Sequence, residues 1–456
     1  MGTVGLSFGS ATSGQGFDVA TTVTQIQASE AAIETPWKSQ LTALQAQDTV
    51  FTSLGSDLST LTTSLQTLTD FSGVMSEKQG SSSNTNVLSL TSASSSATAG
   101  SHTVVVNSLA QTSSDYSDAV GASDTLAGSV TIQVGSGASQ TITVDSSSDT
   151  LSTLAAAINS AGVGVTASII TDSSGSRLSV VSGSSGASGE LTVTSGLSDA
   201  TSGTNIGFNT GQTGVDASLK VDGIPLSSAS NTVSTAIPGV TFQLLSAAVG
   251  SPVQVEITND NTAIETAFAS MVSAYNAVVK DLSTQEGKDA SGSAEPLYGS
   301  PTLALIQGQL SSGLLSGAAS GSIAGVTQLG ISFNNDGTLS LNTDTLDSAL
   351  NSNFSDVTGF LQDSGSFGQS FATVLNNLGT QAPNGAVYLA QQQNSAQEAA
   401  LNQNITNEDA RLATQKTALT DELNTANQIL QSIPSQLNQV NEMYSAITGY
   451  NSTQNG

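Results

Sequence analysis

The sequence predicts a multidomain α+β protein, in which both chain termini form a helical or coiled-coil leg and two β-rich head domains are inserted between them. Apolar residues recur in a heptad pattern near each end, the middle of the chain consists of short alternating runs, and helical periodicity returns after Asp260. A chain of 456 residues is too long for one small core, so we expect several domains.

The first heptad pattern runs from Asp18 to about Asp70. Apolar side chains recur there at alternating spacings of four and three, which is the pattern of a coiled-coil seam. Pro36 removes a backbone donor and predicts a break near Thr35. The apolar seam members are Ile26, Ile33, Trp37, Leu44, Phe51, Leu54, Leu58, Leu61, Leu65 and Leu68.

A second heptad pattern occupies about 402–449, where Pro434 predicts a kink. Two seams at opposite ends suggest that the ends pair with each other or with copies of themselves. The alternative is two independent core helices of a large domain, although heptads sustained over this length are uncommon in globular cores. The seam members are Ile405, Leu412, Leu419, Leu423, Leu430, Ile433, Leu437, Val440, Tyr444 and Ile447.

The middle of the chain predicts short strands bounded by Gly, Ser, Asn and Asp turns. One helix, from Thr150 to Gly162, interrupts them, and the Ser/Gly-rich stretches Ser182–Gly189 and Ser195–Gly214 are interpreted as flexible turns or a connector. The predicted strands are Val87–Leu90, Thr103–Val106, Val130–Val134, Thr141–Val144, Val165–Ile170, Leu178–Val181, Glu190–Thr194, Leu219–Val221, Asn231–Val233, Gly239–Leu244 and Val253–Ile257.

Beyond Asp260 an amphipathic stripe from Ile264 to Leu282 predicts a long helix. A loop follows at Gly287–Gly299, and the turn Asn334–Gly337 precedes the strand Thr338–Leu341. The remaining predicted helices are Leu303–Leu315, Asp344–Leu350, Phe354–Leu361 and Phe367–Leu378.

Composition argues against several classes of function. The net charge is −27 and the eight basic residues are scattered, which disfavours nucleic acid and anionic membrane surfaces as partners. There is no cysteine and one histidine, His102, at the start of a predicted strand, where a surface role is favoured over that of a catalytic base. The acidic turn before Gly337 is better explained as a hairpin than as a calcium loop. We therefore expect no enzymatic site, cofactor or metal.

The N-terminal residues contain no basic segment followed by an apolar one, and no apolar stretch reaches about 18 residues. We therefore expect no membrane span. If the protein leaves the cell, we expect a route that uses no cleavable signal peptide.

Six motifs, taken in order, resemble those of the flagellar hook-associated protein 2 (FliD) family. Each motif is weak alone, but their order between terminal heptads is specific, and Val130–Val181 is also similar to a module shared by flagellins and hook-associated proteins. The motifs are Ser13–Val19 with Glu30 and Pro36; Ser94–Gln111, which ends in Leu-Ala-Gln; Leu219–Ile224; Ser230–Val233 with Ile237–Thr241; Phe268–Val278, which ends in Ala-Tyr-Asn-Ala-Val; and Leu329–Ile331 with Asp336–Leu341.

The resemblance implies an exported protein at the distal tip of the bacterial flagellum, outside the cell. It implies a homo-oligomeric ring of about five copies that retains exported flagellin and promotes its folding and polymerisation. It further implies contacts with a hook–filament junction protein and, before secretion, with a cytoplasmic export chaperone. A secreted adhesin, which would also serve in cell adhesion, or a surface-layer protein is the alternative.

The expected domains are a flexible N-terminal segment at 1–17, an N-terminal helical leg at 18–80, a β-rich head at 81–118 and 214–260, an inserted β-rich head with one helix at 119–213, a helical leg domain at 261–400 and a coiled-coil helix at 401–456.

The C-terminal coil carries only Arg411 and Lys416 as basic residues, whereas coils of the family are often charge-rich. We therefore expect its apolar seam, and not charge, to mediate pairing.

Overall fold

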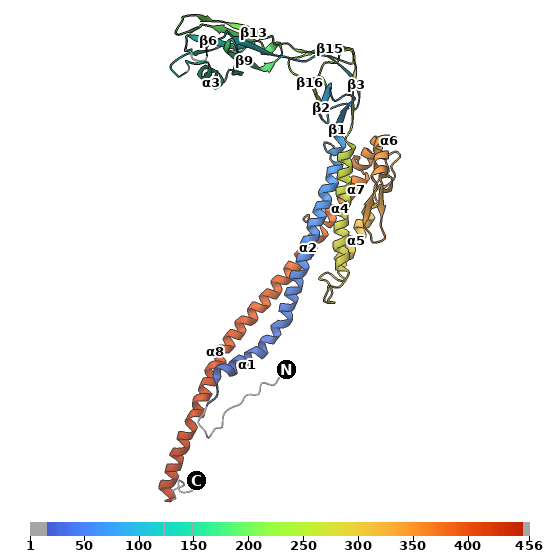
Figure 1. The fold of residues 1–456 in the computed structure, drawn as a ribbon. Coiled ribbons are helices and arrows are strands. Elements are labelled where there is room, and N and C mark those ends of the chain that lie inside the picture. Colours follow the sequence, from blue (N-terminus) through green and yellow to red (C-terminus); the bar gives the residue numbers. More distant parts are fainter. Residues whose placement is uncertain (1–15, 122–123, 148, 450–456) are drawn as a thin grey trace. The chain divides into compact units, whose positions relative to one another are not determined.

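The computed structural model describes residues 16–121, 124–147 and 149–449, which fall into two compact units. The helical unit combines residues 1–66 with 267–456, and the β-rich unit comprises Thr67–Thr266 (Figure 1). The segment expected to be flexible, 1–17, lies outside the described residues except for its last two positions, as do the first three residues of the motif Ser13–Val19.

The predicted N-terminal helix with a break is confirmed. Helix α1 (Val19–Glu30) is followed by the short 3₁₀ segment η1 (Ala31–Ile33) and by α2 (Glu34–Thr69). Asp18 caps α1 by accepting a hydrogen bond from the Thr21 amide at 3.2 Å. Pro36 lies in the first turn of α2, where its missing N–H costs no helical hydrogen bond. The break therefore comes just before the proline.

The C-terminal helix is longer than predicted. Helix α8 (Ala386–Thr448) begins sixteen residues before Asn402 and runs through Pro434 as one helix. Residues 386–401 are rich in Ala and Gln, which favour helix without contributing an apolar heptad. The seam pattern therefore underestimates the length of this helix.

The helices observed in the rest of the helical unit agree closely with those predicted from the sequence. Helix α6 contains one residue with non-helical dihedral angles, Asn353, at the junction between the two short helices predicted there. A two-stranded hairpin contains the turn Asn334–Gly337, where the Asp336 carboxylate accepts a hydrogen bond from the Thr338 amide at 3.0 Å. These elements are α4 (Asn261–Gln285), α5 (Pro301–Leu314), η4 (Val326–Leu329), β19 (Ile331–Phe333), β20 (Leu339–Leu341), α6 (Thr343–Gln362) and α7 (Phe367–Leu378).

The β-rich unit has two separate hydrophobic cores. The first draws its residues from 87–110 and 217–257, and antiparallel sheets β1-β18-β3-β14-β15 and β16-β17-β2 enclose it. Its strands are β1 (Lys78–Ser82), β2 (Leu88–Ala93), β3 (Gly100–Ser108), β14 (Ala217–Val221), β15 (Ile224–Ser228), β16 (Thr232–Ile237), β17 (Val240–Leu244) and β18 (Val253–Asn259); the short η2 (Val74–Ser76) precedes them.

The second core lies entirely within residues 120–206. Helix α3 (Leu151–Ser160) packs on β8 and β9, and Thr150 caps it through the Thr153 amide. The sheets are β13-β4-β9-β8, β10-β6-β7 and β12-β11-β5. Their strands are β4 (Thr112–Ser117), β5 (Leu126–Ala127), β6 (Ser129–Val134), β7 (Gln140–Thr143), β8 (Val165–Asp172), β9 (Gly175–Ser185), β10 (Leu191–Ser195), β11 (Leu197–Asp199), β12 (Asn205–Ile206) and β13 (Phe208–Gln212). The two cores support our proposal of a head at 81–118 and 214–260 with a second head inserted at 119–213.

The interpretation of the Ser/Gly-rich stretches as flexible connectors is wrong. Strand β9 continues to Ser185, η3 covers Ala187–Gly189, and 195–214 holds β11, β12 and β13. Strand β13 is ordered because it pairs with β4, with Phe208 opposite Ser117. Pairing with a partner strand thus outweighs the low strand propensity of Ser, Asn and Gly. The strands β1, β4, β5 and β15 were also missing from the prediction, because their residues are mostly small or polar.

His102, on β3 of the first head, contacts Asp222 in the turn between β14 and β15. Its Nδ1 lies 2.8 Å from Asp222 Oδ2, and Asp222 Oδ1 accepts the Thr103 amide at 2.8 Å. Asp222 has a positive φ of 50° at the β14–β15 turn. The His102 contact, helped by the Thr103 amide, lowers the pKa of Asp222 below its ordinary value of 3.8.

We expect Asp222→Asn to lower the free energy of unfolding at neutral pH. The loss should be less than about 1 kcal/mol, because the pair is partly exposed. Because the pKa of Asp222 is lower in the folded than in the unfolded protein, the ionised carboxylate stabilises the fold at pH values above its unfolded-state pKa. This stabilisation is lost as pH falls through the folded-state pKa. The difference between the two proteins should therefore shrink as pH falls below 3.8, the ordinary value of the aspartate pKa. Asparagine tolerates positive φ, so backbone strain does not confound the comparison. A difference that persists unchanged in acid would contradict this assignment.

None of the helices in the described ranges is both long and apolar enough to cross a membrane.

Candidate assembly surface: the paired terminal helices

The two ends of the chain meet within the helical unit, where α1 lies along α8 (Figure 1). Val19 and Val23 of α1 and Leu412 of α8 are buried there. Gln27 Nε2 donates to the Leu412 carbonyl at 2.6 Å, and the Phe17 amide donates to Asn427 Oδ1 at 2.9 Å. The predicted pairing of the two ends therefore takes place within one protomer.

Charged groups also lie at this contact, and the expectation that the apolar seam mediates pairing stays a prediction, because exposed ion pairs contribute little free energy. Arg411 Nη2 lies 2.7 Å from Glu408 Oε1 on its own helix and 3.6 Å from Glu30 Oε2 on α1. Gln415 Nε2 also donates to Glu30 Oε1 at 2.8 Å. The hydrogen bond from Arg411 lowers the pKa of Glu408. Arg411 is half exposed, and its contact with Glu30 is an ion pair between α8 and α1.

Farther along the chain α2 packs against α8 and α4. Asn394 Nδ2 donates to Asp48 Oδ1 at 2.8 Å, and Ser53 Oγ donates to Asp281 Oδ2 at 3.3 Å. Burial raises the pKa of Asp57, and the neighbouring Asp281 carboxyl acts in the same direction. The second half of the N-terminal seam is fully buried along this segment: Phe51, Leu54, Leu58, Leu61, Leu65 and Leu68.

The remaining seam residues divide by exposure. Ile26, Trp37 and Leu44 are half-buried, whereas Ile33 is 54% exposed. On α8 the half-buried members are Ile405, Leu419, Leu423, Leu430 and Ile433. The structure therefore brings only part of each predicted seam into contact within the protomer.

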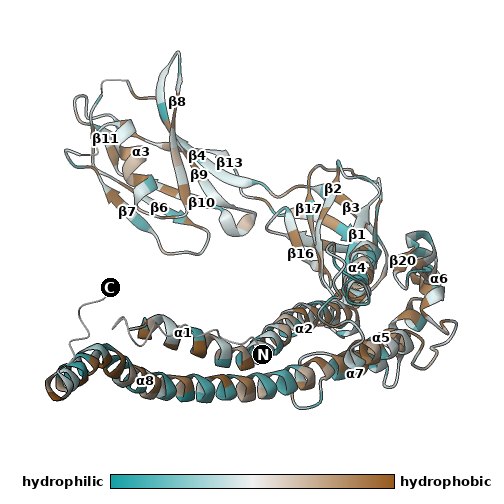
Figure 2. Ribbon diagram, turned by 90° about the horizontal axis from the view of Figure 1, so that it is seen from below, coloured by the Kyte–Doolittle hydropathy of each residue, from teal (hydrophilic) through white to brown (hydrophobic). Residues whose placement is uncertain are grey.

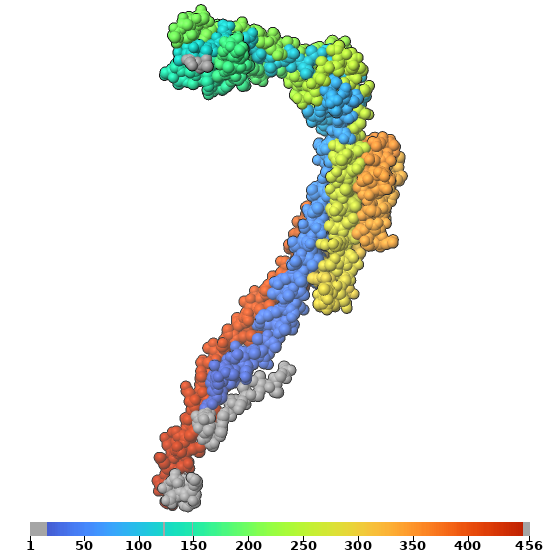
Figure 3. All heavy atoms as spheres, viewed as in Figure 1, coloured from blue at the N-terminus to red at the C-terminus, as the bar shows by residue number. Residues whose placement is uncertain are grey.

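The last turns of α8 expose a continuous apolar face, which we call the C-terminal stripe. Val440 is 60% and Ile447 is 80% exposed. Spacings of three and four place these residues on one side of the helix. The stripe consists of Leu437, Val440, Met443, Tyr444 and Ile447. Met443 was absent from the predicted seam, although its spacing of three from Val440 could have revealed it. Hydrophobic colouring continues to this end of α8 in Figure 2, and α8 extends beyond α1 in Figure 3.

The described residues, 16–121, 124–147 and 149–449, contain no cluster of three or more metal-binding side chains (His, Asp or Glu). The arrangement that the geometry offers is a pair of terminal helices with an uncovered apolar end, which suits protein–protein assembly.

Comparison with known protein families identifies the chain at both ends. Residues 214–446 match the family described as flagellar hook-associated protein 2 C-terminus, and residues 15–113 match its N-terminal counterpart. Residues 129–184 match the flagellin hook IN motif.

Individual relatives agree with this assignment. The B-type flagellar hook-associated protein 2 of Pseudomonas aeruginosa is 28% identical over 353 residues, which cover 70% of this chain and 74% of that protein. The polar flagellar hook-associated protein 2 of Vibrio parahaemolyticus is 26% identical over 179 residues, 38% of this chain and 27% of that one.

The fold is also similar to that of a solved structure. The D1-D2-D3 domains of the flagellar cap protein FliD from Escherichia coli superpose with a TM-score of 0.56 at 28% identity, covering 76% of this chain and 99% of that one. The fold and the matched segments define a structural protein of the bacterial flagellum. The chain belongs to the flagellar hook-associated protein 2 family, which confirms the resemblance and the α+β fold class.

Proposed function

We infer that this chain caps the distal end of the bacterial flagellar filament, outside the cell. The observation that carries the inference is family membership at both ends of the chain, together with the likeness to a flagellar cap protein over 76% of its length. A cap of this kind is oligomeric and acts on flagellin, the filament subunit. No observation favours the adhesin alternative.

The finer mechanism is our proposal. Copies assemble into a ring of about five, as closed cyclic symmetry allows, and the C-terminal stripe seats each helical leg against a neighbouring copy. The ring holds flagellin at the tip while it folds and inserts beneath the cap. The exposed stripe supports this proposal, because an apolar face of this kind is stabilised by burial in an assembly.

The same proposal includes two further partners. An uncovered apolar stripe is an aggregation hazard before export, so an export chaperone that covers it in the cytoplasm is consistent with its exposure. When no filament is present, the cap rests on the hook–filament junction protein.

Localisation and filament growth test the function. In a strain lacking this gene, the full chain carrying a small epitope tag should label filament tips by immunogold electron microscopy. Without the chain, unpolymerised flagellin should accumulate in the medium and filaments should be short or absent. Label along the shaft, or filaments of normal length without the chain, would exclude capping.

A further inference from the structure

The inserted head contains two buried polar atoms that lack hydrogen-bond partners. Ser113 is 0% exposed and Asp115 is 6% exposed, and Ser113 Oγ and Asp115 Oδ1 are both without a partner among the described residues. The two side chains alternate with exposed or half-buried neighbours along β4, so they share the inward face of the strand. The buried Ser113 hydroxyl and one oxygen of the buried Asp115 carboxylate are thus unsatisfied, which is costly, so a bound group is expected to compensate them.

The surroundings of Asp115 provide oxygen atoms and negative charge. Thr210 of β13 lies directly opposite Asp115, and Glu190 precedes β10, a strand that packs on β4. Burial raises the pKa of the Asp115 carboxyl, and the charge of Glu190 adds to this effect. Hydrogen bonds from the Thr210 side chain and from the Val193 backbone oppose it. The Glu190 carboxylate is itself held in place, because its Oε2 accepts the Gly214 amide.

No basic side chain contributes to this environment. Arg177 is the basic residue of the neighbouring strand β9, but its guanidinium lies 5.7 Å from the centre of the Tyr116 ring and donates to the Ser117 carbonyl at 3.2 Å. Tyr116 is exposed and alternates with Asp115 along β4, so Arg177, which lies over the Tyr116 ring, is on the face of the sheet opposite Asp115. Among the described residues, no basic side chain therefore acts as a counter-charge on Asp115.

We propose that Ser113, Asp115 and Glu190 form a cation site in the inserted head, and that its cation is Ca²⁺. The available ligands are carboxylate and hydroxyl oxygens, which hard cations prefer, and Ca²⁺ accepts irregular coordination completed by water. Two carboxylates match its charge. Protonation of Asp115 is a poorer explanation, because Ser113 and Asp115 form no hydrogen bond with one another and Ser113 would remain unsatisfied.

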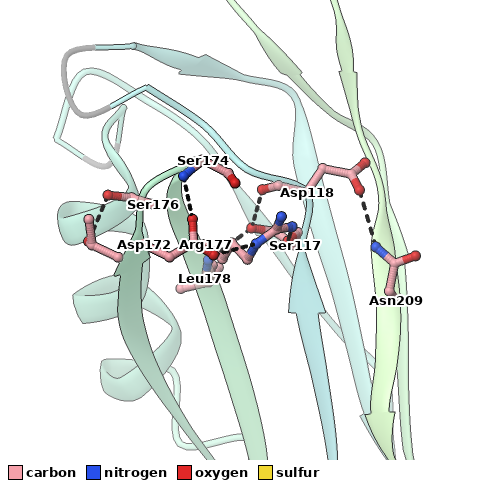
Figure 4. A network of polar contacts seen from close by, with 9 residues as sticks. Ser117, Asp118, Asp172, Ser174, Ser176, Arg177, Leu178 and Asn209 are labelled. Carbon is pink, nitrogen blue, oxygen red and sulfur yellow. Dashed lines mark hydrogen bonds and ion pairs between the residues drawn. The ribbon is translucent and has the colours of Figure 1, made fainter.

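The test uses the full chain, first stripped of metal with EGTA and then given about 1 mM CaCl2, a concentration suited to extracellular sites. MgCl2 and NaCl at equal ionic strength serve as comparisons. Thermal unfolding and isothermal titration calorimetry are measured for the parent, for Asp115→Asn and for the control Asp118→Asn. Asp118 is exposed, and its carboxylate accepts hydrogen bonds from the Gly207 amide and from Asn209 (Figure 4).

Ca²⁺ should raise the unfolding temperature of the parent and of Asp118→Asn by several degrees, with one site per chain, and should leave Asp115→Asn unchanged. Without Ca²⁺, Asp115→Asn should be at least as stable as the parent, because a neutral amide removes the uncompensated charge. An equal Ca²⁺ response in Asp115→Asn overturns the site. Absence of saturable binding also overturns it, and an equal response to Mg²⁺ overturns the assignment to Ca²⁺.

Discussion

Replacing Leu437, Val440 and Ile447 together by serine should abolish cap assembly and leave the protomer folded. These side chains are exposed in the protomer, so their loss should change its free energy of unfolding by no more than about 0.5 kcal/mol each. Between copies the same side chains would be buried, and each would then contribute roughly 1.5–3 kcal/mol. The loss of all three contributions should therefore prevent stable association of the legs of neighbouring copies.

The measurements are light scattering of the purified protein and the flagellin content of the culture medium. We expect a monomer by light scattering, leaked flagellin and short or absent filaments. Replacing Ser435, Gln439 and Ser445 of the same helix by alanine is the matched control, because these polar positions lie outside the stripe and the helix gains propensity. Normal rings and filaments from the triple serine variant, at normal protein level, would show that the stripe does not seat the legs.

The opposite behaviour is expected for the buried half of the N-terminal seam. Leu58→Ala and Leu61→Ala should each lower the free energy of unfolding of the protomer by about 2–5 kcal/mol, since each removes a fully buried side chain and leaves a cavity. Urea unfolding followed by helical circular dichroism measures the loss.

Ile33→Ala is the control for this pair, because Ile33 has the same chemistry but is 54% exposed, so its replacement should cost little. Equal losses at Leu58 and Ile33 would mean that α1, η1 and α2 pack differently from the structure described here. Assembly defects in the two leucine variants should follow from loss of folded protomer, and folded protomer recovered from them should still form rings.

These predictions separate residues that the heptad pattern treats alike. Leu61 and Val440 occupy equivalent seam positions, yet Leu61 is buried in the protomer and Val440 is 60% exposed. A heptad repeat states which face of a helix is apolar and leaves open what covers that face. The distinction between a stabilising core and an assembly surface therefore needed the tertiary contacts.

Polar side chains show the same limit. The scarcity of charge on the C-terminal helix is visible in the sequence, but the contact of Arg411 with Glu30 joins residues 381 positions apart. Similarly, alternation along β4 indicates from the sequence that Ser113 and Asp115 share a face. That both side chains are buried, each with an oxygen that lacks a hydrogen-bond partner, follows only from the packing of the neighbouring strands.

Local pattern by itself determined the heptad helices at both termini, the break before Pro36, the capped helix at Thr150 and the fold class, because helix periodicity, capping and proline geometry act over a few residues. Ordered motifs also determined the family. Tertiary structure alone decided that Ser195–Gly214 contains strands, that most of the N-terminal seam but only Leu412 of the C-terminal seam is buried, and that the apolar residues at the end of α8 are exposed. Strand pairing and burial depend on partners distant in sequence, and their free energy outweighs the weak preferences of Ser, Gly and Asn along a single segment.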